Sequence, residues 1–172
     1  MVRICSAFLL VISAFVLCSQ ASAQARELEY YQKLKQLKTF ESKRQDVESL
    51  FEYLSSKDSL ESGGSKTVYL EPKGANLDVY YSTGRCSEHH SKLGFDIAKD
   101  TVIGVHILFY EEIPYSSFDF DLRKFRRYQE NDNNSIHYTN ESLGIELIGG
   151  KDKVRSIEFS GSEELQEKYR CK

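Results

Sequence analysis

The residues with the greatest potential for chemistry lie in one short segment, Cys86-Ser87-Glu88-His89-His90. Thiolate, carboxylate and imidazole groups are zinc ligands, and a thiolate beside a histidine is the arrangement of a nucleophilic Cys–His pair. A zinc site needs three or four such groups in tetrahedral geometry, so a strand residue such as His106 or His137 would have to complete it. Adjacent histidines project in different directions, so the segment more simply predicts a solvated loop with no metal or cofactor.

The N-terminus has the features of an export signal. Arg3 supplies a positive charge, residues 7–17 are almost entirely apolar, and Ala21-Ser22-Ala23 is a small-residue cleavage site. The apolar run is shorter than the roughly 20 residues of a membrane span, although an uncleaved anchor is the alternative. We expect cleavage after Ala23, so that the mature protein starts at Gln24 and is periplasmic or secreted without a stable membrane anchor.

The expected export bears on which of the four cysteines remain and whether they form a disulfide. Cys18 would carry a lipid only in a lipobox, which requires a small residue where this chain has Leu17. Cleavage removes Cys5 and Cys18 and leaves Cys86 and Cys171 as an even pair in a compartment where disulfides persist. We predict a Cys86–Cys171 bond, which is worth roughly 4–5 kcal/mol in the chain-entropy model. The alternative is a free, reactive Cys86.

Two helices are expected at the start of the mature chain. Apolar residues recur at helical spacing over residues 26–38. A second helix is expected to start at Ser42, because Ser42 and Gln45 match a capping box. Its buried face would consist of Val47, Leu50, Phe51 and Leu54.

The rest of the chain favours strands. Short apolar or alternating runs predict strands at 67–71, 77–81, 101–110, 136–139, 143–148 and 154–159, with the last three forming a meander. The run at 101–110 is apolar on both faces, which is typical of a central strand. Residues 55–65, 83–99 and 111–134 are expected to be mainly irregular. This order predicts an α+β fold, with two N-terminal helices packed on an antiparallel sheet of about six strands in a single domain over residues 24–172.

A basic segment lies within the expected irregular region. It consists of Arg123, Lys124, Arg126 and Arg127, with Phe125 and Tyr128 interleaved. Such a patch can contact anionic lipid or an acidic partner. The alternative that we favour is a solvated surface beside one buried phenylalanine, partly neutralised by the nearby Asp119 and Asp121.

An aromatic stretch precedes the basic segment. Its members are Tyr110, Tyr115, Phe118 and Phe120. Exposed together, these rings would form a partner-binding patch. We favour inward-facing rings that close one end of the sheet.

Two segments carry a resemblance to known proteins, namely S-K-R-Q-D-V-E-S-L-F at 42–51 and Y-S-T-G-R-C at 81–86. They are similar to the motifs S-T-R-x-D-V-E-x-L-L-G and Y-S-S-G-x-C of an uncharacterised family of small secreted bacterial proteins. Residues 100–102, residues 121–127 and the near-terminal Cys171 also fit. The chain departs from the pattern at Glu52, where the family tends to have glycine, so the resemblance does not define the end of the second helix. The family brings no function with it.

A more distant likeness concerns the second helix alone. Its D-V-E-S-L-F sequence resembles the D-V-x-x-L-L-G signature of the small lipoprotein of the outer-membrane β-barrel assembly machine and of β-lactamase-inhibitor-like domains. This likeness implies an envelope interaction module by analogy of fold.

Composition and the absence of known catalytic motifs reduce the number of function classes to consider. The formal net charge is −3, which gives no electrostatic basis for binding nucleic acid. The sequence has no H-E-x-x-H, G-x-S-x-G, P-loop or Rossmann pattern. We therefore expect an exported, non-enzymatic interaction or structural module whose partner is another envelope or secreted protein. The alternative is a small metal-binding protein or enzyme that uses residues 86–90.

Overall fold

A computed structural model describes residues 28–51, 59–62, 65–70, 74–84, 86, 94–130 and 134–171. The predicted signal peptide, its cleavage site and the segment 87–93 lie outside the described residues. The described α-helices span residues 28–34, Arg44–Leu50 (α2) and Glu163–Tyr169 (α3). Two 3-10 helices, η1 (Tyr115–Ser117) and η2 (Leu122–Lys124), lie between strands.

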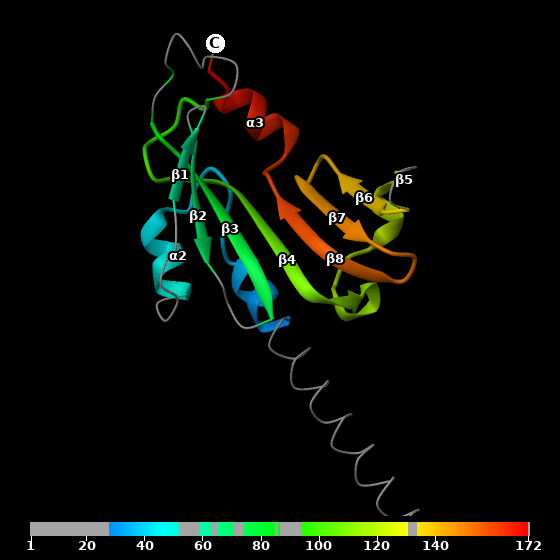
Figure 1. The fold of residues 1–172 in the computed structure, drawn as a ribbon. Helices are drawn as coiled ribbons and strands as arrows, with labels where there is room; N and C mark the ends of the chain where they lie inside the picture. Colours follow the sequence, from blue (N-terminus) through cyan, green and yellow to red (C-terminus); the bar gives the residue numbers. More distant parts are fainter. Residues whose placement is uncertain are drawn as a thin grey trace, which may run out of the picture.

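Eight described strands form one antiparallel sheet in the order β1-β2-β3-β4-β8-β7-β6-β5 (Figure 1). Their bounds are Ser59–Ser62 (β1), Ser65–Leu70 (β2), Ala75–Ser82 (β3), Val102–Pro114 (β4), Arg126–Gln129 (β5), Ile136–Asn140 (β6), Ile145–Gly149 (β7) and Lys153–Phe159 (β8). β4 lies in the interior of this order, which confirms the central strand expected from its apolar run. β8 pairs with β4, so the chain returns to the middle of the sheet at its end.

The predicted fold class, two N-terminal helices packed on about six strands, is wrong. Strands dominate the described residues, and α2 and α3 have only seven residues each. β1 and β5 arise from segments that we expected to be irregular. The last three strands pair as expected, but β8 also joins β4 and thereby leaves β5 at the outer edge. Backbone pairing therefore formed strands where the side-chain pattern indicated none.

The predicted capping box at the second helix is also wrong in detail. The helix begins at Arg44, and Lys43 rather than Ser42 is the N-cap residue. The Asp46 carboxylate accepts the backbone N–H of Lys43 at 2.6 Å, while Ser42 Oγ accepts the backbone N–H of Lys38 at 2.9 Å. A carboxylate in the first turn also suits the positive end of the helix dipole.

The core lies against one face of the sheet. Leu77, Ile107, Ile157 and Leu147 form a row across β3, β4, β8 and β7, and all four side chains are fully buried. Alternation along each strand places every second residue on this face. The same core includes side chains from the two N-terminal helical segments, namely Tyr30, Tyr31, Leu34, Val47 and Phe51.

Candidate binding surface

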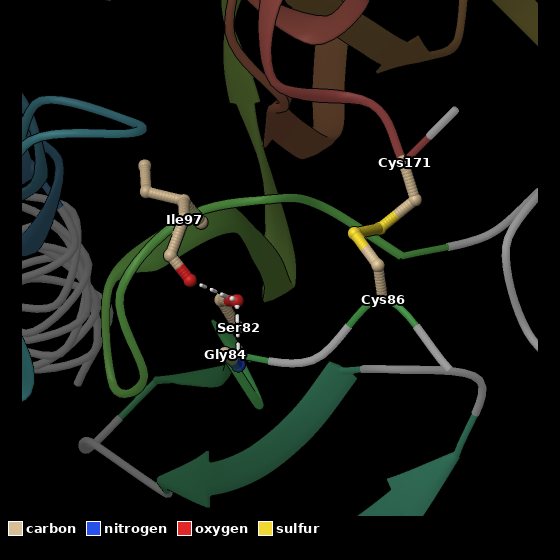
Figure 2. The surroundings of a disulfide bond; sticks show 5 residues. All are labelled: Ser82, Gly84, Cys86, Ile97 and Cys171. Carbon is tan, nitrogen blue, oxygen red and sulfur yellow. Dashed lines mark hydrogen bonds between the residues drawn. A yellow bond between two sulfur atoms is a disulfide. The ribbon is translucent and has the colours of Figure 1, made fainter. Parts of the chain in front are cut away.

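In the structure, Cys86 and Cys171 form the disulfide expected from the sequence, with a Cα–Cα distance of 5.5 Å (Figure 2). The end of β3 is held close to this bond. Ser82 Oγ donates to the carbonyl oxygen of Ile97 at 3.2 Å and accepts the N–H of Gly84 at 3.0 Å. The bond attaches the C-terminal segment to the chain that leaves β3, and it commits the Cys86 sulfur to a structural role.

The strand histidines lie apart from each other. His106 is on β4 and His137 on β6, with β8 and β7 between these two strands. His106 Nδ1 lies 3.5 Å from Asp78 Oδ2. Glu88, His89 and His90 fall outside the described residues. Among the residues that are described, no three His, Cys, Asp or Glu side chains are grouped so as to hold a metal ion.

His137 instead belongs to a cluster that holds β5 in place. Its Nδ1 lies 2.8 Å from Glu146 Oε1, and the Tyr128 hydroxyl donates to the same carboxylate at 2.8 Å. The Tyr128 and His137 rings stack with their centroids 4.5 Å apart. Burial and, secondly, the hydrogen bond to Glu146 raise the pKa of Tyr128 to about 12, so its hydroxyl keeps its proton at neutral pH. The cluster therefore links β5 to β6 and β7.

Ionisable residues also form a row on the face opposite the core. Asp78, His106, Glu158 and Glu146 are opposite one another on β3, β4, β8 and β7. Burial is the main cause that raises the pKa of the Glu158 carboxyl, and the nearby Glu146 raises it further, while His106 acts in the opposite direction. This face is polar at its centre, and its carboxylates interact across strands.

The edge of the sheet at β5 is exposed. All four β5 residues are exposed, and in the described part of the chain the strand pairs only with β6. The Glu130 N–H donates to the carbonyl oxygen of Ser135 at 2.9 Å, which fixes the phase of the ladder. Because backbone groups alternate in direction along an antiparallel strand, those of Arg126 and Tyr128 face β6, and those of Arg127 and Gln129 face outward.

The basic segment identified in the sequence follows this edge. Arg123 and Lys124 lie on η2, and Arg126 and Arg127 on β5, with all four side chains exposed. Arg123 pairs with Asp121 at 2.8 Å and Arg126 with Glu141 at 3.0 Å. The partial neutralisation that we expected involves Asp121.

Asp119, the other carboxylate expected to neutralise the segment, is engaged elsewhere. It accepts hydrogen bonds from Tyr31 and Lys35. Within the described residues, Lys124 and Arg127 have no ion pair. The edge therefore keeps cationic side chains available at both η2 and β5.

The aromatic stretch is mostly inward-facing. Phe118 is buried and Tyr115 and Phe120 are half-buried, whereas Tyr110 is 60% exposed and contradicts the expectation. The Tyr115 and Tyr138 rings lie 5.1 Å apart. Burial, followed by the proximity of Tyr138, raises the pKa of Tyr115 to about 12, while the Arg127 charge opposes this shift. Arg127 thus lies close enough to this tyrosine pair to affect it.

No protein-family model matches the chain, and neither a curated protein nor a solved structure is detectably similar to it. In the part of the chain that is described, no helix has the length and apolar character needed to cross a bilayer.

Proposed function

We propose that this chain is an exported, non-enzymatic binding module that recognises a protein partner through the β5 end of its sheet. The observation that carries the proposal is the exposed edge strand β5, which combines outward-facing backbone groups with cationic side chains. An open edge with unpaired N–H and C=O groups is a template for another strand. Such edges are a recurring site of peptide recognition.

Export is supported by two independent features. Residues 1–23 have the charge, apolar run and small-residue end of a signal peptide. The Cys86–Cys171 disulfide is a bond that persists in oxidising compartments. The resemblance to a family of small secreted proteins points in the same direction.

A non-enzymatic role is supported by the state of Cys86. A sulfur in a disulfide is neither a thiolate ligand nor a nucleophile, so the bond removes the thiol of the 86–90 segment from any such chemistry. The competing function, a metal-binding protein or enzyme, would then depend on Glu88, His89 and His90 together with a strand histidine. Zinc retained stoichiometrically by the purified protein, and lost from a His89→Ala/His90→Ala variant, would favour that alternative.

Site-specific cross-linking tests the proposed function. A photoreactive side chain replaces Gln129 at the edge in one variant and Lys99, exposed on the loop before β4, in a matched control. Each disulfide-bonded mature protein is illuminated with the envelope and secreted fractions of its native cells. We expect a discrete protein adduct from position 129 that excess unlabelled protein suppresses, and none from position 99. No adduct at 129, or equal adducts at both positions, would contradict the proposal.

A further inference from the structure

We infer, building on the proposed function, that the partner presents an extended acidic segment that adds to β5 as a further antiparallel or parallel strand. Among the strands that the structure describes, β5 is the last in the sheet order, and β6 pairs with one of its two sides. Figure 1 shows β5 at the outer limit of the β8-β7-β6 half of the sheet.

The backbone supplies the first part of the recognition. Arg127 and Gln129 each direct one N–H and one C=O away from β6, since the bond from Glu130 to Ser135 sets the opposite phase for their neighbours. Groups spaced two residues apart match the repeat of an extended peptide. The Tyr128–His137–Glu146 cluster holds β5 against the rest of the sheet, so the edge is ordered before a partner arrives.

The side chains define the charge of that partner. Arg126 and Arg127 are neighbours in a strand, so they project to opposite faces. A partner strand with consecutive carboxylates would therefore meet Arg127, which has no ion pair among the described residues, on one face, and on the other face Arg126, which already pairs with Glu141 at 3.0 Å. Lys124 extends the positive charge at the start of β5, whereas Glu130 follows its end with a negative charge. Carboxylates should consequently be favoured opposite Arg126 and Arg127 and disfavoured opposite Glu130.

The same geometry argues against two other occupants. A second copy of β5 paired in parallel and in register, or antiparallel about Arg127, would place arginine opposite arginine, and like charges opposed across strands are destabilising. A flat anionic membrane needs cations directed to one side, but Arg126 and Arg127 direct theirs to both faces of the sheet. An acidic peptide strand satisfies the outward backbone groups and pairs with Arg127, while Arg126 would share its charge between the peptide and Glu141.

Peptide binding tests the inference directly. The probe is a fluorescent ten-residue peptide that alternates valine with threonine at its ends and carries two central glutamates. Its binding to the disulfide-bonded protein is followed by anisotropy. We expect binding by this peptide and none by a matched peptide with two central lysines. Arg127→Glu should weaken binding by about tenfold or more, equivalent to about 1.4 kcal/mol, while Lys99→Glu, the same charge change elsewhere, should leave it within about twofold.

Two changes isolate the backbone contribution. Gln129→Pro removes an outward N–H without removing a bond to β6, and proline is tolerated at such edge positions. N-methylation of alternate peptide amides blocks strand addition without altering the protein, so this arm remains valid if the proline variant fails to fold. Each change should weaken binding by about tenfold.

The outcomes separate the inference from the function on which it rests. Equal binding of the N-methylated peptide would overturn strand addition. Preference for the lysine peptide, or binding only to vesicles that contain phosphatidylglycerol, would overturn the acidic strand as the partner. A specific adduct from position 129, with no binding of the acidic peptide, would overturn this inference while leaving the proposed function intact. Absence of a specific adduct from position 129 would instead contradict the proposed function itself.

Discussion

β4 and β5 are consecutive strands in the chain but occupy opposite situations in the same sheet. β4 has 13 residues, pairs on both sides and is largely buried along Val102–Phe109. β5 has four residues, all of them exposed, although the Tyr128 ring stacks on His137, and among the described strands it pairs with β6 alone. Burial is therefore concentrated in the interior of the sheet, and exposed backbone groups and charged side chains lie at its edge.

The pairing of β8 with β4 produces this difference. Ile107 of β4 lies opposite both Leu77 of β3 and Ile157 of β8, so its two lateral positions are filled by apolar neighbours. The chain after β4 then has to form its next strands on the far side of β8. β5 is left at the rim because β6 and β7 occupy the positions between. A strand that contributes little to the core is free to carry charge.

The largest expected effect comes from placing a charge in the interior strand. Ile107→Asp would bury an unpaired carboxylate at a fully buried position, and we expect loss of the fold because the cost is several kcal/mol or more. The matched change Gln129→Asp in β5 should alter the free energy of unfolding by about 0.5 kcal/mol or less. Urea unfolding followed by circular dichroism provides the measurement. Similar losses for both variants would show that the two strands do not divide their roles in this way.

The interior of the sheet was the predictable part of this molecule. The apolar run of β4 and the alternation in β3 follow directly from burial on one or both faces. The disulfide was predictable because the expected cleavage after Ala23 would leave two cysteines, Cys86 and Cys171. These signals depend on the local sequence or on the number of cysteines. They can therefore be recognised without knowing which strands pair.

The rim was not predictable, since nothing in its residues requires a strand. Arg126-Arg127-Tyr128-Gln129 has no buried position and hence no hydrophobic alternation. β5 forms because its backbone pairs with β6 and because Tyr128 contacts His137 and Glu146, which lie on the following strands. The basic run was visible in the sequence. Its position at an open edge of the sheet was not, because that position depends on the long-range pairing of β8 with β4.

The disulfide should have the next largest effect. Cys86→Ser and Cys171→Ser should each lower stability by about 2–5 kcal/mol, and the double variant should cost little more than either single one. Thermal unfolding with and without reductant measures this. Acidic-peptide binding at β5 should persist in whatever fraction stays folded, since the bond lies near the end of β3. Two titratable thiols in the unfolded, unreduced mature protein would contradict the bond.

A smaller loss is expected where the β6–β7 turn meets the chain after β8. Gly144 has φ +63°, and a Cβ there would lie 1.9 Å from the carbonyl oxygen of Gly161. Gly144→Ala should therefore cost roughly 1–3 kcal/mol through strain and displaced backbone. Gly150, where an added Cβ has nearly free space, provides the control in a Gly150→Ala variant. Equal melting temperatures for the two variants would show that the close approach of Gly144 to the Gly161 backbone does not constrain the turn.

The smallest expected effect concerns Glu158, which lies opposite His106 on the interior strand β4. Burial raises the pKa of its carboxyl above the ordinary 4.5, so the folded state holds this proton more tightly than the unfolded state. As pH rises through 4.5, the unfolded chain ionises first, and the stability associated with the protonated carboxyl is lost until the folded pKa is passed. Glu158→Gln should hence melt at a higher temperature than the unchanged protein at pH 7, with the difference disappearing below pH 4.5. Glu164→Gln, exposed on α3, should show no such pH-dependent gain. A destabilised Glu158→Gln variant at pH 7 would mean that the Glu158 charge is stabilised by its neighbours, and that the interior of this sheet tolerates ionised groups as readily as its rim.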